Sequence, residues 1–98
     1  MMKFAFLIMG DFDSPKDRAA IHGGAAQIIG VPSVEAACRE AAALAEEGVG
    51  CIELCGAFNA EDARRVIEAT GNKIPVGFVT HLPEQDGIFA KAFGNGGN

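Results

Sequence analysis

The fold is decided by the stretch from Gly48 to Phe58, which reads GVGCIELCGAF. Its pattern is a glycine that ends one helix, a short apolar strand, and a glycine turn that leads into the next helix. The apolar run from Cys51 to Cys55 lacks alternation with polar residues, which is typical of a strand covered on both faces in a parallel sheet. Glu53 is the one charged residue in that run, and burying an unpaired carboxylate is costly. We therefore expect Glu53 to be buried and hydrogen-bonded to a polar partner.

Helices are predicted on both sides of this strand. Before it, Ser33 is a typical N-cap, and an apolar stripe at helical spacing runs from there to Gly48. After it, Asn59 precedes a helix over 60–70, with Asp62 placed to complete a capping box. Ser14-Pro15 predicts one further, short helix that stops at the paired glycines 23 and 24.

Three more apolar segments read as strands, and strands that alternate with helices imply parallel pairing through right-handed crossovers. They are Lys3–Met9, Gln27–Val31 and Pro75–Thr80, and a last helix is expected over Asp86–Phe93. The sequence therefore predicts one α/β domain over residues 1–98. Its sheet is small, four-stranded and mainly parallel, in a half-barrel-like or three-layer arrangement.

Composition excludes several classes of protein. Hydrophobic residues make up 49% of the chain and charged residues 21%, which is typical of a globular domain. The net charge of -5 argues against a nucleic-acid partner, because phosphate neutralisation needs a basic patch. No apolar run is long enough to span a bilayer, and the run Phe4–Met9 is too short for a signal peptide, so we expect a cytoplasmic protein without a membrane partner. In that compartment the three cysteines are expected to be thiols.

Polar residues gather where the predicted strands end, and ligands of parallel sheets bind at the carboxyl ends of the strands. This placement predicts a small-molecule site there. The candidate catalytic residues are Glu53, Cys55 and His81, and the candidate substrate-binding residues are Asp11, His22, Asn59 and Thr80. A Cys-His or Glu-His pair would suit nucleophilic or acid-base chemistry.

Three interpretations of Glu53 remain open: a buried acid paired with His81 or Lys73, a general base, or a metal ligand. Asp11 and Asp13 together with Glu53 and His81 could form an oxygen-rich Mg²⁺ or Mn²⁺ site, but we expect neither a metal nor a cofactor. Cys38 and Cys51 are expected to be small core residues, which leaves Cys55 as the one thiol placed to react. No phosphate-binding or dinucleotide-binding glycine motif is present.

Four phrases of the sequence are similar to a known family. They are FAFLIMGDFD (4–13), HGGAAQIIGV (22–31), GVGCIELCGAF (48–58) and IPVGFVTHLPEQD (74–86). Over 2–93 the chain resembles a prokaryotic family known only as domain of unknown function 6506. The resemblance implies a compact α/β protein without an assigned activity, and it supplies no catalytic residues.

Two functions fit these observations. The first is a small protein that binds a small molecule at its strand ends, and that is an enzyme if Glu53, Cys55 and His81 act together. The second is a non-catalytic, homo-oligomeric structural or interaction module. A short parallel sheet leaves two edges that one small domain can hardly cover, so we expect a homo-oligomer in either case.

Overall fold

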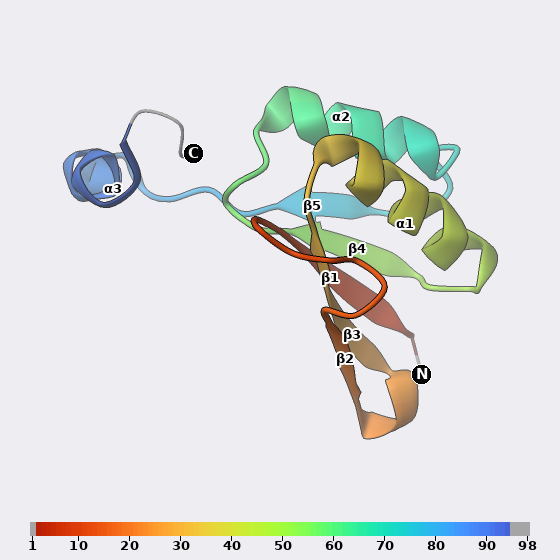
Figure 1. Ribbon diagram of the computed structural model, residues 1–98. Helices are drawn as coiled ribbons and strands as arrows, with labels where there is room; N and C mark the ends of the chain where they lie inside the picture. Colours follow the sequence, from red (N-terminus) through yellow and green to blue (C-terminus); the bar gives the residue numbers. More distant parts are fainter. Residues whose placement is uncertain (1, 95–98) are drawn as a thin grey trace.

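The computed structural model describes residues 2–94 and contains a five-stranded sheet in the order β2-β3-β1-β4-β5 (Figure 1). Strand β2 runs antiparallel to β3, and the remaining neighbours are parallel. The α/β class and the mainly parallel sheet are thus confirmed. The elements are β1 (Phe4–Met9), β2 (Arg18–Ile21), β3 (Ala26–Val31), α1 (Val34–Glu46), β4 (Cys51–Leu54), α2 (Ala60–Ala69), β5 (Val76–Phe78) and α3 (Asp86–Phe93).

The fifth strand, β2, replaces the helix predicted from Ser14-Pro15. The carbonyl of Asp13 accepts hydrogen bonds from the backbone N–H groups of Lys16 and Asp17, which closes a turn where a helix was expected. The chain then pairs with β3, Arg18 opposite Ile29, and Arg18 also contacts Glu40 of α1 at 3.1 Å. The prediction of a helix here was wrong because pairing with a neighbouring strand outweighs a local helix-start signal.

Both long helices lie on the same face of the sheet (Figure 1). That face supplies alternate residues of β1, β3, β4 and β5 to the core, and α1 and α2 cover them, whereas all four residues of β2 are exposed. The largest fully buried side chains are Leu7, Ile29, Val31, Leu44, Val49, Ile52, Leu54, Phe58 and Val66. The three-layer alternative is therefore not formed: the segment predicted as a short helix contributes the edge strand β2, and the second face of the sheet carries no helix among the described residues.

The helix ends follow the sequence signals. The hydroxyl of Ser33 accepts a hydrogen bond from the backbone N–H of Ala36 at 3.1 Å, which caps α1. Gly48 has φ +90°, a conformation that glycine adopts without strain, and it turns the chain from α1 into β4. An ion pair of 3.2 Å between Arg65 and Glu35 joins α2 to α1.

The last part of the chain leaves the sheet. After β5, an extended linker leads to a short 3-10 helix (Pro83–Gln85) and to α3, which has the bounds expected from the sequence. Figure 1 shows α3 standing apart from α1 and α2. We call residues 81–93 the C-terminal arm. Residues 1 and 95–98 of the predicted domain lie outside the described residues.

Candidate functional site

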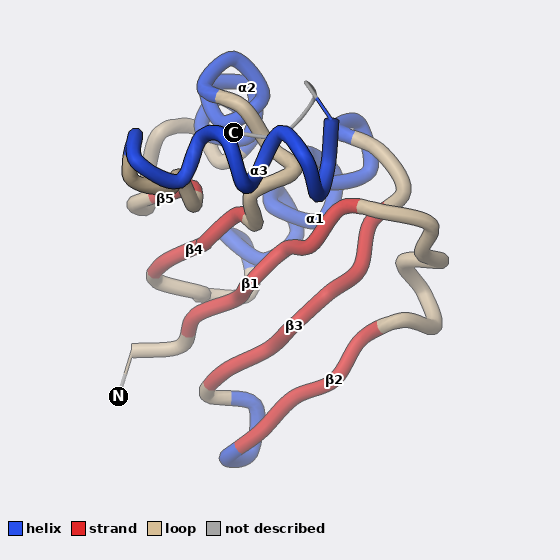
Figure 2. Tube along the Cα trace, turned by 90° about the vertical axis from the view of Figure 1, so that its left-hand side faces the viewer, coloured by secondary structure: helices blue, strands red, loops and turns tan. Residues whose placement is uncertain are grey.

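The face of the sheet that carries no helix holds four of the eight large apolar side chains that are exposed among the described residues: Phe4, Ile21, Ile28 and Val79. We call it the open face. The register aligns its residues in rows: Phe6 lies between Ile28 of β3 and Glu53 of β4, and Glu53 lies beside Gly77 of β5. Figure 2 shows the strands of this sheet side by side. The open face consists of Phe4, Phe6, Ile8, Ala19, Ile21, Ala26, Ile28, Gly30, Cys51, Glu53 and Gly77, together with Val79, which follows β5 on the same side by alternation.

Glu53 belongs to the open face and is exposed, so the expectation that it is buried was wrong. The error came from reading the unbroken apolar run Cys51–Cys55 as evidence for cover on both faces. The partner of Glu53 is neither His81 nor Lys73 but the Cys51 thiol, whose sulfur lies 3.6 Å from Oε1. Because the Glu53 carboxylate is exposed to water, its position in a strand is no longer evidence that it belongs to a binding or catalytic site.

The three thiols are free and partly buried. Cys38 and Cys55 pack against the core, whereas Cys51 faces the open side, which corrects its expected place. Burial raises the pKa of the Cys38 thiol, and burial together with the hydrogen bond and charge of Glu53 raises the pKa of the Cys51 thiol. Both therefore carry less thiolate near neutral pH than a free cysteine. The Cys55 sulfur accepts a hydrogen bond from the backbone N–H of Met9 at 3.3 Å.

His81 lies in the C-terminal arm, and its described contacts are with other residues of that arm. Its Nε2 is 2.7 Å from Asp86 Oδ1, and its ring stacks on Phe89 with 3.9 Å between centroids. Among the described contacts of His81 there is none with Glu53 or Cys55. Glu53 lies in β4, Cys55 follows the end of that strand, and His81 has a different set of partners, so the described contacts include none among these three side chains.

The predicted substrate-binding residues are spread over the molecule. Asp11 and Thr80 are exposed and follow β1 and β5, so both lie at the carboxyl edge of the sheet. His22 follows β2, whose last residue Ile21 pairs with Ala26 at the start of β3. Because β2 is antiparallel, His22 lies at the opposite, amino-end edge. The structure does not bring it together with Asp11 or Thr80.

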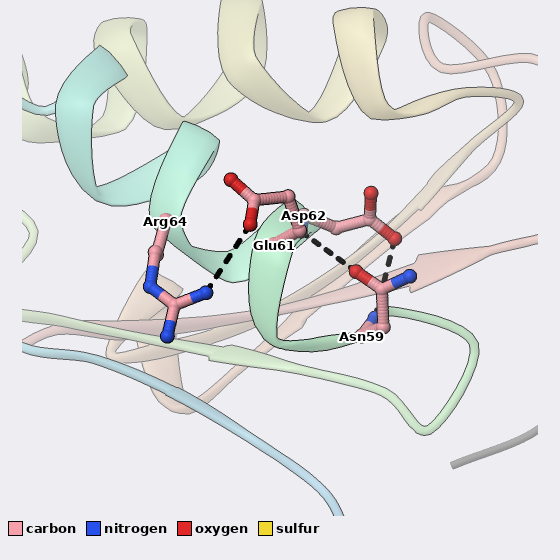
Figure 3. A network of polar contacts seen from close by, with 4 residues as sticks. All are labelled: Asn59, Glu61, Asp62 and Arg64. Carbon is pink, nitrogen blue, oxygen red and sulfur yellow. Dashed lines mark hydrogen bonds and ion pairs between the residues drawn. The ribbon is translucent and has the colours of Figure 1, made fainter.

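Asn59 caps the N-terminus of α2 (Figure 3). Its side-chain oxygen accepts a hydrogen bond from the backbone N–H of Asp62 at 2.8 Å, and Asp62 Oδ2 accepts one from the backbone N–H of Asn59 at 3.2 Å. This reciprocal capping box begins α2, and the neighbouring pair Glu61–Arg64 adds an exposed ion pair. The predicted cap is confirmed, and it leaves Asn59 with little freedom to contact a substrate.

Among the described residues, a candidate metal site is absent and one cavity lies apart from the predicted site residues. Residues 2–94 hold no group of three His, Cys, Asp or Glu side chains that could bind a metal ion. A cavity of about 280 Å³ lies between the ends of α1 and α2, lined by Ala42, Glu46, Thr70 and Lys73 among others, and shares no residue with the predicted site. None of the described helices has the length and apolarity needed to cross a membrane.

Sequence reasoning missed the open face itself. Its signal was present in β1, where Phe4, Phe6 and Ile8 alternate with Ala5 and Leu7. Alternation places the two sets on opposite faces, but both sets are apolar, so the sequence does not distinguish the face that is covered by helices from the other.

Comparison with known proteins assigns a family. The model of a family of unknown function, DUF6506, matches residues 2–94, so the chain belongs to this family and the resemblance is confirmed. No curated protein and no solved structure matches the chain.

Proposed function

We propose that this DUF6506 protein is a non-catalytic, homo-oligomeric interaction module whose copies associate through the open face. One observation carries the proposal: large apolar side chains of this face remain in contact with water. Phe4 is 45% exposed, Ile28 41%, Val79 46% and Ile21 70%. Single exposed apolar residues are ordinary, but a contiguous apolar patch of this kind marks an interaction surface.

Burying the apolar side chains of the open face against a second copy lowers the free energy more than leaving them in water. Completing the burial of a half-exposed Phe or Ile side chain contributes about 1 kcal/mol, and the open face offers several such side chains on each copy. Association must offset the loss of translational and rotational freedom, which costs about 4–15 kcal/mol. A small contact would therefore fail, and the whole face has to take part.

The experiment is a charge placed in the middle of the open face. Ile28→Lys keeps a strand position but puts an ammonium group where the second copy would pack, so we expect it to shift the chain to monomers. Ala43→Lys is the matched control, because Ala43 is exposed on α1, in the helix layer. Sedimentation velocity on both variants and on the natural chain measures the outcome. Equal masses for Ile28→Lys and the natural chain would contradict the proposal.

A small-molecule site on the same face is the second candidate, and the position of Glu53 favours it. This carboxylate is the only charged group of the open face, and it lies beside Gly77, which has no side chain to cover it. A thermal-shift screen against small polar compounds tests it on the natural chain and on Glu53→Gln. A compound that raises the Tm of the natural chain alone would support a site that uses Glu53. Equal shifts in both chains would count against it.

A further inference from the structure

We infer that the C-terminal arm of each copy packs on the open face of a second copy, so that two chains form a dimer by exchanging their arms. This inference rests on the proposed function and specifies its geometry. It assigns one occupant, the segment 81–93 of the partner copy, to a surface that the chain's own helices leave uncovered.

The arm lacks a packing surface in its own chain. Helix α3 has eight residues. Isolated helices shorter than about 12–15 residues are marginal in water, so a helix of this length needs tertiary contacts. Yet Leu82, Ile88 and Phe93 are 64%, 61% and 69% exposed, and α3 has no buried residue. Figure 1 shows α3 connected to the sheet by an extended linker.

The arm is nevertheless held in one shape by contacts within itself. His81 binds Asp86 and stacks on Phe89, and the Phe89 ring lies 5.8 Å from that of Phe93. These contacts connect the linker to the helix, so that the arm can dock without much further ordering. A preorganised segment loses less entropy on binding than a disordered one.

The area of the two surfaces suits an exchanged dimer. Three apolar side chains with roughly 100–150 Å² exposed on each give about 300–450 Å² for one arm. A two-fold axis makes the arm-to-face contact twice. Counted on both surfaces of both contacts, the buried area is then about 1,200–1,800 Å², which is the size of a stable specific interface. One contact alone would fall below that size.

One charge of the arm is complementary to the open face: Lys91 is opposite in sign to Glu53, whereas Glu84 and Asp86 share the sign of Glu53, and Asp86 already contacts His81. Glu53 is the only charged residue of the open face, and its described contact is with a thiol, not with a cation. Lys91 is exposed on α3 and belongs to none of the ion pairs formed by the described residues. In an exchanged dimer, Lys91 of one copy pairs with Glu53 of the other, and the two-fold axis repeats the pair.

The test uses two full-length variants, Glu53→Lys and Lys91→Glu, with mass in solution as the readout. Each variant alone places like charges together at both contacts, so we expect its dimer dissociation constant to rise about tenfold or more. Mixed in equal amounts, the two variants form a heterodimer in which both contacts again join opposite charges, and dimers should return. Lys73→Glu is the control, because it makes the same charge change on a residue outside the arm and the open face.

The outcomes separate the two proposals. A natural chain that dimerises, while both variants dimerise equally well or their mixture does not recover, overturns the arm exchange and leaves the proposed module in place. A natural chain that stays monomeric overturns both. If that monomer also loses thermal stability in each variant, the arm folds back on its own sheet, which again contradicts exchange.

Discussion

The ring of Phe12 packs directly on the backbone of Gly30, in the space that a side chain at position 30 would fill. Phe12 lies in the loop after β1, and a Cβ atom built on Gly30 would be 2.5 Å from Phe12 Cγ. A second glycine, Gly10, also lies against the ring, at 3.0 Å from its edge by the same measure. The loop therefore packs on the carboxyl end of the open face, and glycine is required at position 30 because the ring occupies the space of a side chain.

This contact predicts the effect of Gly30→Ala. The new methyl group would overlap atoms near the backbone of Phe12, which cannot move aside as the tip of a flexible side chain can, so we expect a loss of about 1–3 kcal/mol in the free energy of unfolding. Urea denaturation measures it. Gly56→Ala is the control, because its nearest neighbour would be 4.0 Å away. In Phe12→Ala/Gly30→Ala the two losses should not add; an additive result would rule out this contact.

Glu53 shows where residue-level reasoning stopped. Sequence patterns placed it correctly in a strand. They did not reveal that the side chain faces water, because a strand between two apolar layers and a strand with one uncovered apolar face have the same composition. The expected partnership with His81 failed for a related reason: His81 belongs to an arm with its own contacts, and strand order carries no information about where a linker leads.

At the scale of elements, α2 depends on its first turn. Asn59 and Asp62 satisfy two backbone N–H groups that have no partner inside the helix. Replacing Asn59 by Ala removes one of these bonds and should lower the free energy of unfolding by about 1 kcal/mol. Asn59→Asp is the matched variant, because aspartate is an equally good cap. Thermal denaturation of the two variants checks this, and equal stability of Asn59→Ala and the natural chain would contradict the structural role.

The elements differed in how well the sequence predicted them. Helices α1, α2 and α3 and strands β1, β3, β4 and β5 were expected, because periodic apolar residues and caps are local signals. Strand β2 was not expected, because Arg18–Ile21 has no strand signature of its own and acquires its structure by pairing with β3. Its ion pair with Glu40 in α1 is likewise a contact between residues distant in sequence. Contacts of this kind decided the number of strands and the number of layers.

At the scale of the molecule, the open face and the C-terminal arm are two apolar surfaces that no other part of the described chain covers. Helices cover one face of the sheet, the other face is apolar and partly exposed, and the C-terminal arm extends away from both. The largest extent of the molecule is 39 Å, against 26 and 25 Å in the other two directions. The proposed association rests on the exposed apolar side chains of the open face, and the proposed exchange adds the arm as the second half of the contact.

The most direct test of this account is the mass of the natural chain in solution, measured by light scattering over a dilution series. We expect a dimer at micromolar concentrations that dissociates reversibly on dilution, because the proposed interface would be of ordinary size and would include an ion pair. A chain that stays monomeric up to high micromolar concentration would contradict it.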